Sequence, residues 1–199
     1  MIVAVILAAG DSSRMGSPKA LLKIGECSFI RQICGMYEKS DVDKIIVVSQ
    51  PDATAIHHEL EGKYIAVVPN PDYPKGQLSS VITGVDAAEK LHAEAVLIHP
   101  VDHPAVGEVV VNSLINAYRR DKSLLVIPTY NGERGHPVLF SSELFQELRQ
   151  APLTVGARDV VRKHARSTTE IEVGDKGVIL DIDTREDYEN LRRNLQSTD

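Results

Sequence analysis

The sequence predicts an α/β protein with a mainly parallel, twisted sheet that is covered by helices on both faces. Short apolar runs rich in β-branched residues alternate with amphipathic helical patterns along the first two thirds of the chain. Unbroken apolar runs of this length are typical of strands buried on both faces, and alternation with helices favours parallel pairing. We expect such strands at 2–7, 44–49, 65–69, 95–99 and 124–128.

Three apolar stripes with helical spacing lie between these expected strands. Each stripe predicts a helix that packs one face against the sheet. The three stripes run from Phe29 to Tyr37, from Leu78 to Leu91 and from Val110 to Tyr118.

The pattern changes after residue 128. Asn131-Gly132 is a strong tight-turn signal, and it predicts a hairpin that joins a strand at 124–130 to one at 136–140. Beyond it we expect short helices at 141–150 and 154–164, strands at 169–173 and 178–182, and a closing helix from about 184. No repeat or linker interrupts the pattern, so we expect one domain over 1–199.

Composition narrows the classes of partner. The 199 residues carry a net charge of −6 and contain no basic stripe, which argues against nucleic acid as a partner. No apolar run approaches the roughly 20 residues of a membrane span, so we expect no membrane partner and a cytoplasmic location. Cys27 and Cys34 lack zinc-site spacing and are expected to be buried, reduced thiols.

The loop after the first strand is the strongest functional feature. Residues 7–19 read LAAGDSSRMGSPK, and a small-residue turn at the end of a buried first strand is the expected ligand position in an open α/β sheet. Backbone amides of Leu7, Ala8, Ala9 and Gly10 can approach an anion, while Arg14 and Lys19 supply two cations. This combination suits a triphosphate, although the loop is neither a Walker A motif nor a G-x-G-x-x-G fingerprint.

The sequence at this loop resembles the nucleotidyltransferases related to molybdenum cofactor cytidylyl- and guanylyltransferases. The resemblance recurs in order at GQLSS (76–80), PVDHP (100–104), RGHPVLF (134–140) and DIDTREDY (181–188). It implies a Rossmann-like, glycosyltransferase-A-type sheet with one antiparallel strand. It also implies a nucleotide-binding part at about 1–105 and an acceptor-binding part at about 106–199. The residues LAAG and RGHPVLF are more similar to the cytidylyl branch, which implies CTP as substrate and pyrophosphate as product.

Two aspartates are the expected metal ligands. Asp102 directly follows the strand at 95–99, and the resemblance implies that it binds Mg²⁺, with Mn²⁺ as the alternative. Asp183 is the second carboxylate that the resemblance favours. Each aspartate also has a structural alternative as a helix cap, Asp102 for a helix near Val106 and Asp183 for the closing helix. The chain departs from the family at Arg185, where relatives commonly have proline.

The remaining site residues lie on the base and acceptor sides. Gly76 and Ser80 belong to the start of the second helix, and the resemblance implies that Ser80 contacts the nucleobase. Asn70 is a candidate for base or ribose, with an ordinary turn as the alternative. His136 is the candidate for contact with a terminal phosphate of the acceptor.

The resemblance implies transfer of CMP from CTP to a phosphate of molybdopterin, with Arg14, Lys19 and Asp102 as the expected catalytic set. An acceptor phosphate is already ionised, so the chemistry needs positioning and charge stabilisation more than a base. A sugar phosphate or another phosphorylated metabolite is the alternative acceptor, and a non-catalytic nucleotide-binding protein is the alternative of another class. Transient contact with a molybdoenzyme or its maturation factor is a further expectation.

Overall fold

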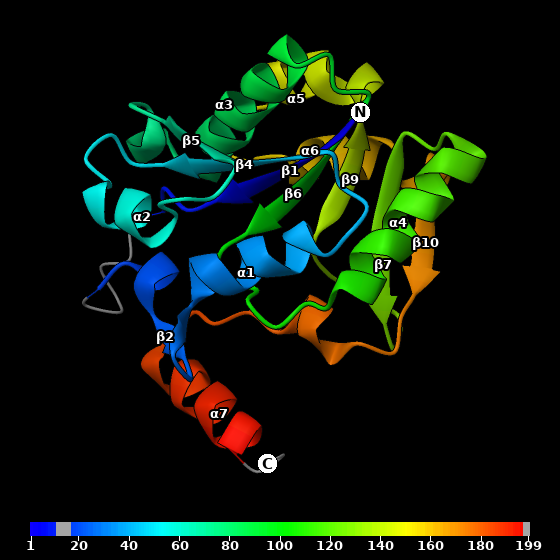
Figure 1. Cartoon of the computed structure of the whole chain (residues 1–199). Helices are drawn as coiled ribbons and strands as arrows, with labels where there is room; N and C mark the ends of the chain where they lie inside the picture. Colours follow the sequence, from blue (N-terminus) through cyan, green and yellow to red (C-terminus); the bar gives the residue numbers. More distant parts are fainter. Residues whose placement is uncertain (11–16, 197–199) are drawn as a thin grey trace.

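The computed structural model describes residues 1–10 and 17–196, and its centre is a twisted eight-stranded sheet (Figure 1). The order of the strands is β10-β7-β9-β6-β1-β4-β5, and β8 pairs with β7. The strands are β1 (Ile2–Leu7), β4 (Lys44–Ser49), β5 (Ile65–Pro69), β6 (Ala95–Pro100), β7 (Leu125–Tyr130), β8 (Glu133–Arg134), β9 (Val138–Ser141) and β10 (Thr168–Glu172). The expected α/β class with a mainly parallel sheet is therefore confirmed.

Helices cover both faces of the sheet. α3 (Gln77–Lys90) and α5 (Phe145–Gln150) lie on one face, while α1 (Phe29–Glu38) and α4 (Glu108–Asp121) lie on the other (Figure 1). The shorter elements are α2 (Thr54–Glu59), α6 (Arg158–Lys163) and a small hairpin of β2 (Lys23–Ile24) with β3 (Cys27–Ser28). None of the described helices combines the length and apolar character that a membrane crossing requires.

Strand β1 shows why its sequence has no polar side. Ile2, Ala4 and Ile6 belong to the apolar cluster under α1 and α4, whereas Val3 and Val5 belong to the cluster under α3 and α5. Side chains alternate between the faces of a strand, so a strand between two helical layers must be apolar at every position. β1 is accordingly buried throughout.

The antiparallel part of the sheet differs in detail from the expectation. Asn131 and Gly132 have positive φ and form the expected turn, but the turn joins β7 to the two-residue β8. The expected strand at 136–140 begins only at Val138, and a cis His136–Pro137 peptide lies between β8 and β9. β9 then pairs antiparallel with both β6 and β7.

The expectation of a strand at 178–182 was wrong. Lys176–Ile179 forms a 3₁₀ turn, and residues 180–184 form no strand. Val178 and Ile182 are buried, which accounts for the apolar run, but the Asp175 side chain accepts a hydrogen bond from Gly177 and closes a turn instead. The helix expected at 154–164 begins at Arg158, and the helix expected near Val106 begins at Glu108.

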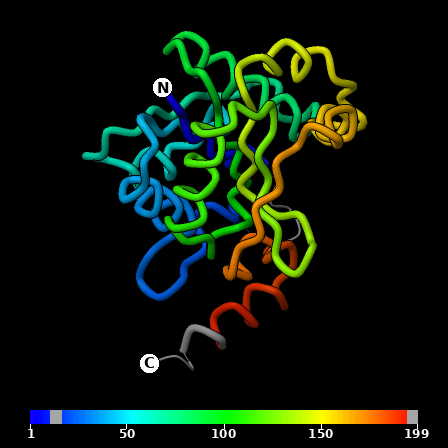
Figure 2. Tube along the Cα trace, turned by 90° about the vertical axis from the view of Figure 1, so that its right-hand side faces the viewer, coloured from blue at the N-terminus to red at the C-terminus, as the bar shows by residue number. Residues whose placement is uncertain are grey.

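The chain ends in α7 (Arg185–Gln196), which extends away from the sheet in both views (Figures 1 and 2). Its contacts are with the N-terminal part of the chain. Tyr188 donates a hydrogen bond to the carbonyl of Lys23 at 2.7 Å, and its ring lies edge-on to Phe29 at 6.0 Å between centroids. These contacts hold α7 against β2 and the start of α1.

Candidate active site

The site forms where the loops after β1 and β6 leave the sheet. The chain runs from β1 through β4 to β5 on one side, and then returns to place β6 on the other side of β1. Ligands bind at such a switch point because the two loops diverge and leave a crevice. The register pairs Leu7 with Pro100, and the amide of Val101 donates to the carbonyl of Leu7 at 3.1 Å.

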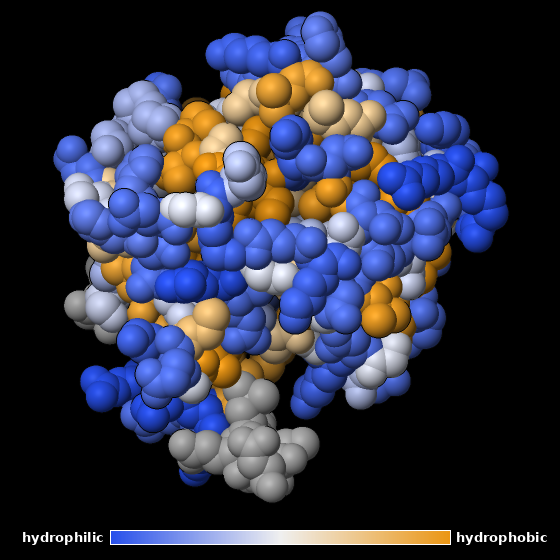
Figure 3. All heavy atoms as spheres, viewed as in Figure 1, coloured by the Kyte–Doolittle hydropathy of each residue, from blue (hydrophilic) through white to orange (hydrophobic). Residues whose placement is uncertain are grey.

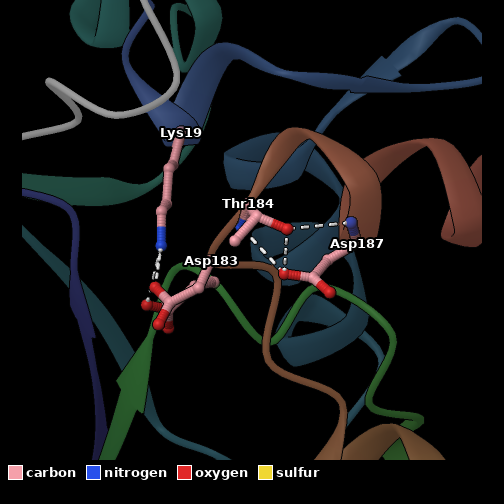
Figure 4. Close-up of polar contacts among 5 residues, drawn as sticks. Lys19, Asp183, Thr184 and Asp187 are labelled. Carbon is pink, nitrogen blue, oxygen red and sulfur yellow. Dashed lines mark hydrogen bonds and ion pairs between the residues drawn. The ribbon is translucent and has the colours of Figure 1, made fainter.

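Lys19 joins two carboxylates at this crevice. Its Nζ lies 2.6 Å from Oδ1 of Asp183 and 3.4 Å from Oδ2 of Asp102, and Figure 4 shows the lysine directed at Asp183. The lysine side chain is 14% exposed, so solvent screens this charge only in part. The structure therefore brings together three of the residues expected to form the site.

Helix capping, the alternative role for both aspartates, belongs to other residues. Thr184 and Asp187 exchange the hydrogen bonds that begin α7, with 2.8 Å from the Thr184 amide to the Asp187 carboxylate (Figure 4). The amide of Gly107 before α4 donates to Asp175 at 2.9 Å, so Asp102 does not cap that helix. Asp183 is held beside Asp102 by the backbone, because the Ile182 amide donates to the Asp102 carbonyl at 2.9 Å.

Asp102 also belongs to a group of ligand atoms that suits a divalent cation. Asp102, His103 and Asp181 each offer one atom, and these atoms lie within 4.8 Å of one another. Oδ1 of Asp102 is buried without a hydrogen-bond partner among the described residues. Burial, followed by the charges of Asp102 and Asp183, raises the pKa of Asp181 to about 6. Crowded carboxylates of this kind are stabilised by a bound cation.

Asn70 and Ser80, expected on the base side, form a second cluster. The Asn70 amide nitrogen donates to Ser79 Oγ at 2.9 Å and to Ser80 Oγ at 3.0 Å, and all three residues are buried. Gly76 precedes α3 with a φ of 102°, a conformation that favours glycine, and its carbonyl accepts from Ser79 at 2.7 Å. The amide donors of Asn70 are therefore engaged within the protein, where they fix the first turn of α3.

His136, expected on the acceptor side, lies against His103 with ring centroids 4.7 Å apart. Burial is the main reason that the pKa of His136 is lowered to about 3, with neighbouring His103 as the next cause. Burial also lowers the pKa of His103. His136 is therefore uncharged at neutral pH, and burial also favours the uncharged form of His103.

A pocket of about 680 Å³ extends from this centre toward α6. Asp102, His103 and Asp181 line one part of it, and His136 and Leu7 also line it. Apolar side chains line much of the rest, and they include Leu153, Val155, Val161, Ile127, Val138 and Phe140. A pocket with an apolar wall and a few charged groups is typical of small-molecule sites.

The described start of the expected nucleotide loop is tightly packed. Leu7, Ala8 and Ala9 are buried while Gly10 is exposed, and the amide of Ala8 donates to the carbonyl of Val48 at 2.8 Å. Gln50 donates to the carbonyl of Ala9 at 3.3 Å. Arg14 lies outside the described residues.

Sequence reasoning did not assign His103, Asp181 or Arg158 to the site. The strand expected at 178–182 is absent, so Asp181 reaches the site from a segment that forms no strand. The adjacency of His103 to Asp102 was the available signal for His103. No motif in the sequence pointed to Arg158, because its position in the pocket depends on how α6 packs in the folded protein.

The fold and the site together define a nucleotidyltransferase-type α/β protein. Residues 4–168 match the model of the MobA-like NTP transferase domain, and the chain belongs to this family. The chain is 30% identical to the molybdenum cofactor cytidylyltransferase of Escherichia coli K12 over 192 residues, which cover 92% of each chain. It is 27% identical to the purine catabolism protein PucB of Bacillus subtilis 168, over 96% of each chain.

Solved structures share this fold. Rv0371c of Mycobacterium tuberculosis H37Rv superposes with a TM-score of 0.82 at 25% identity, covering 97% of this chain and 98% of that one. A structure of Rv0371c in complex with manganese superposes with a TM-score of 0.73 at 25% identity, covering 96% of this chain and 98% of that one.

Proposed function

We propose that this protein transfers CMP from CTP to the phosphate of molybdopterin and releases pyrophosphate. The observation that carries the proposal is the position of Lys19 between Asp102 and Asp183, at the end of the loop where a triphosphate is expected. The similarity to a molybdenum cofactor cytidylyltransferase over nearly the whole chain supports the choice of nucleotide and acceptor.

In this reaction an oxygen of the acceptor phosphate attacks the α-phosphorus of CTP. A new P–O bond forms, the bond between the α-phosphorus and its bridging oxygen to the β-phosphate breaks, and pyrophosphate leaves. The attacking phosphate is already ionised, so no residue needs to remove a proton. Lys19, together with Arg14, balances the negative charge that builds up between the two phosphates.

The carboxylates at the crevice fit a divalent cation, because Asp102 Oδ1 is buried without a partner among the described residues. Asp102 and Asp183 would hold Mg²⁺, or Mn²⁺ as the alternative, with Asp181 close by. A cation bound there would neutralise charge on the phosphates of the nucleotide. Buried Asn70 would orient the first turn of α3, so that Ser80 and Gly76 face the nucleobase.

A pyrophosphate-release assay tests the proposal. CTP, GTP, ATP and UTP are supplied in turn with Mg²⁺ or Mn²⁺, each with and without molybdopterin, and with a sugar phosphate as a second acceptor. We expect release that requires molybdopterin and is fastest with CTP. Pyrophosphate release with the sugar phosphate but not with molybdopterin would show that the acceptor is a sugar phosphate. No release with any pair would contradict a catalytic role and favour a nucleotide-binding protein.

A further inference from the structure

Two anions must approach each other in the proposed reaction, and each needs a positive charge. Lys19 lies on the nucleotide side, where it follows the loop after β1. The acceptor phosphate must reach the same centre from the pocket. Like charges at close range repel strongly in a partly buried site, so the pocket itself should supply a cation for the acceptor.

The histidines in this pocket are engaged with their neighbours. His136 is half-buried and packs against His103, and the carbonyl of Ile98 occupies part of its hydrogen-bonding capacity. An arginine side chain carries a permanent positive charge, so the arginines of the pocket lining are the candidates for this cation.

Two arginines line the pocket, and they differ in their partners. Arg134 forms an ion pair with Glu170 through both its Nε and Nη2 atoms. Arg158, at the start of α6, is exposed and has no ion pair within the part of the chain that the structure describes. Arg158 and His136 line the same pocket.

The segment that leads to Arg158 also presents apolar side chains to the same pocket. Leu153 is 48% exposed and Val155 is 39% exposed, and both line the pocket. Large apolar side chains left exposed in a pocket are typical of a site that buries an apolar part of its ligand. Residues 153–158 therefore present two apolar side chains and one positive charge to the same pocket.

We propose that Arg158 binds the phosphate of the acceptor, while Leu153 and Val155 pack against the acceptor's less polar body. The planar guanidinium offers two parallel N–H donors that match a phosphate, which a lysine ammonium does not. The proposal rests on the function proposed above and assigns the acceptor side of its site. It predicts an acceptor that carries a phosphate next to an extended apolar or ring-shaped moiety.

Steady-state kinetics of an Arg158→Gln variant test this assignment. We expect KM for molybdopterin to rise roughly 10- to 100-fold, as for the loss of a hydrogen bond to a charged group, while KM for CTP changes less than about twofold. Arg158→Lys should recover part of the loss, because it restores charge without the planar fork. Arg162→Gln is the matched control, since Arg162 is an exposed arginine on the same helix that does not line the pocket.

Equilibrium binding of molybdopterin to the same variants, without nucleotide, separates the two proposals. Weaker binding by Arg158→Gln than by Arg162→Gln would support the assignment even if turnover with CTP were never observed. If the two variants bind molybdopterin equally and have equal KM values, Arg158 does not bind the acceptor. The proposed function would still hold in that case, provided that the wild-type protein turns over CTP and molybdopterin. Circular dichroism of each variant excludes misfolding as the cause of a difference.

Discussion

Lys19 contacts two carboxylates that lie 83 and 164 residues away in the sequence. Each carboxylate accepts a charge-assisted hydrogen bond or ion pair from a single Nζ atom, and Asp183 lies at the shorter distance. In the proposed reaction this positive charge lies beside the phosphates. Its contribution should therefore be to turnover more than to stability, because the partner Asp183 is 43% exposed and partly screened.

We predict that Lys19→Ala lowers turnover by about 10²- to 10³-fold, the cost of removing one preorganised donor from a site where charge develops. Lys23→Ala is the control, because Lys23 lies on the nearby β2 and its side chain is exposed. Pyrophosphate release gives the rates, and circular dichroism checks the fold. A Lys19→Ala enzyme with nearly wild-type turnover would remove Lys19 from the catalytic set.

At the same scale, the sequence predicted which residue types the crevice contains but not how they pair. Lys19, Asp102 and Asp183 were expected in the site and do meet there. The capping of α7 by Thr184 and Asp187 is what leaves Asp183 available to Lys19. Which of these adjacent polar residues caps the helix and which one pairs with Lys19 depends on the positions of their side chains. Residue identity alone does not specify those positions.

At the scale of elements, α3 packs closely on the sheet through a glycine. A Cβ placed on Gly84 would lie 2.2 Å from Cγ1 of Val5, a distance that real side chains do not tolerate. Val5 is buried in the middle of β1, so neither partner can move aside without disturbing the core. The absence of a side chain at Gly84 therefore allows α3 to lie close to β1. The first turn of α3 carries Ser79 and Ser80 of the site, so the same packing also positions these two serines.

We predict that Gly84→Ala lowers the free energy of unfolding by about 1–3 kcal/mol, the usual cost of overpacking a core. Gly35→Ala is the matched control, since Gly35 is also inside a helix but has no atom within 4 Å of its added Cβ. That control should be neutral or stabilising by up to about 1 kcal/mol, because alanine favours helix. Urea denaturation measures both, and equal effects would contradict the packing explanation.

The segment after β10 shows where pattern reading fails for an element. Its apolar residues predicted a strand because burial and strand formation both select such residues. In the structure Val178 is buried below a close crossing, where a Cβ on Gly177 would lie 2.3 Å from the carbonyl oxygen of Ala105. The amide of His136 donates to the carbonyl of Val178 at 2.8 Å. The segment therefore packs across the end of the sheet instead of extending it.

At the scale of the whole molecule, His99 links the helical layer to the turn that bears Asp102. It is fully buried on β6, and its Nε2 lies 2.9 Å from the carbonyl oxygen of His103. A carbonyl only accepts, so Nε2 carries the proton and the Tyr37 hydroxyl donates to Nδ1 at 2.9 Å.

The surface of the molecule is mixed in character. The face in Figure 3 shows hydrophilic residues together with smaller apolar patches.

Acid stability should report on this buried ring. Burial lowers the pKa of His99 from 6.5 to about 3, so the unfolded chain takes up a proton that the folded protein excludes. The contribution of His99 to the free energy of unfolding is thus fully present above pH 6.5 and falls as the pH drops toward 3. The limit is about 1.4 kcal/mol per pH unit for one group.

We predict that His99→Gln reduces the pH dependence of the free energy of unfolding between pH 6.5 and 5, as measured by urea denaturation, while buried His136 contributes the same slope in both proteins. His58→Gln is the control, because the His58 side chain is 76% exposed. Its slope should match that of the wild type. A wild-type slope that His99→Gln leaves unchanged would show that other groups dominate acid unfolding.

The sequence by itself determined the α/β class, the positions of the parallel strands and the residue types of the crevice. These features follow from local periodicity and from apolar runs that must be buried on both faces of a sheet. The tertiary structure alone decided that Lys19 lies between Asp102 and Asp183, that Asp181 joins His103, and that Arg158 faces the same pocket. The physical reason is that these contacts join segments far apart in the chain, and packing across the whole sheet sets their distances.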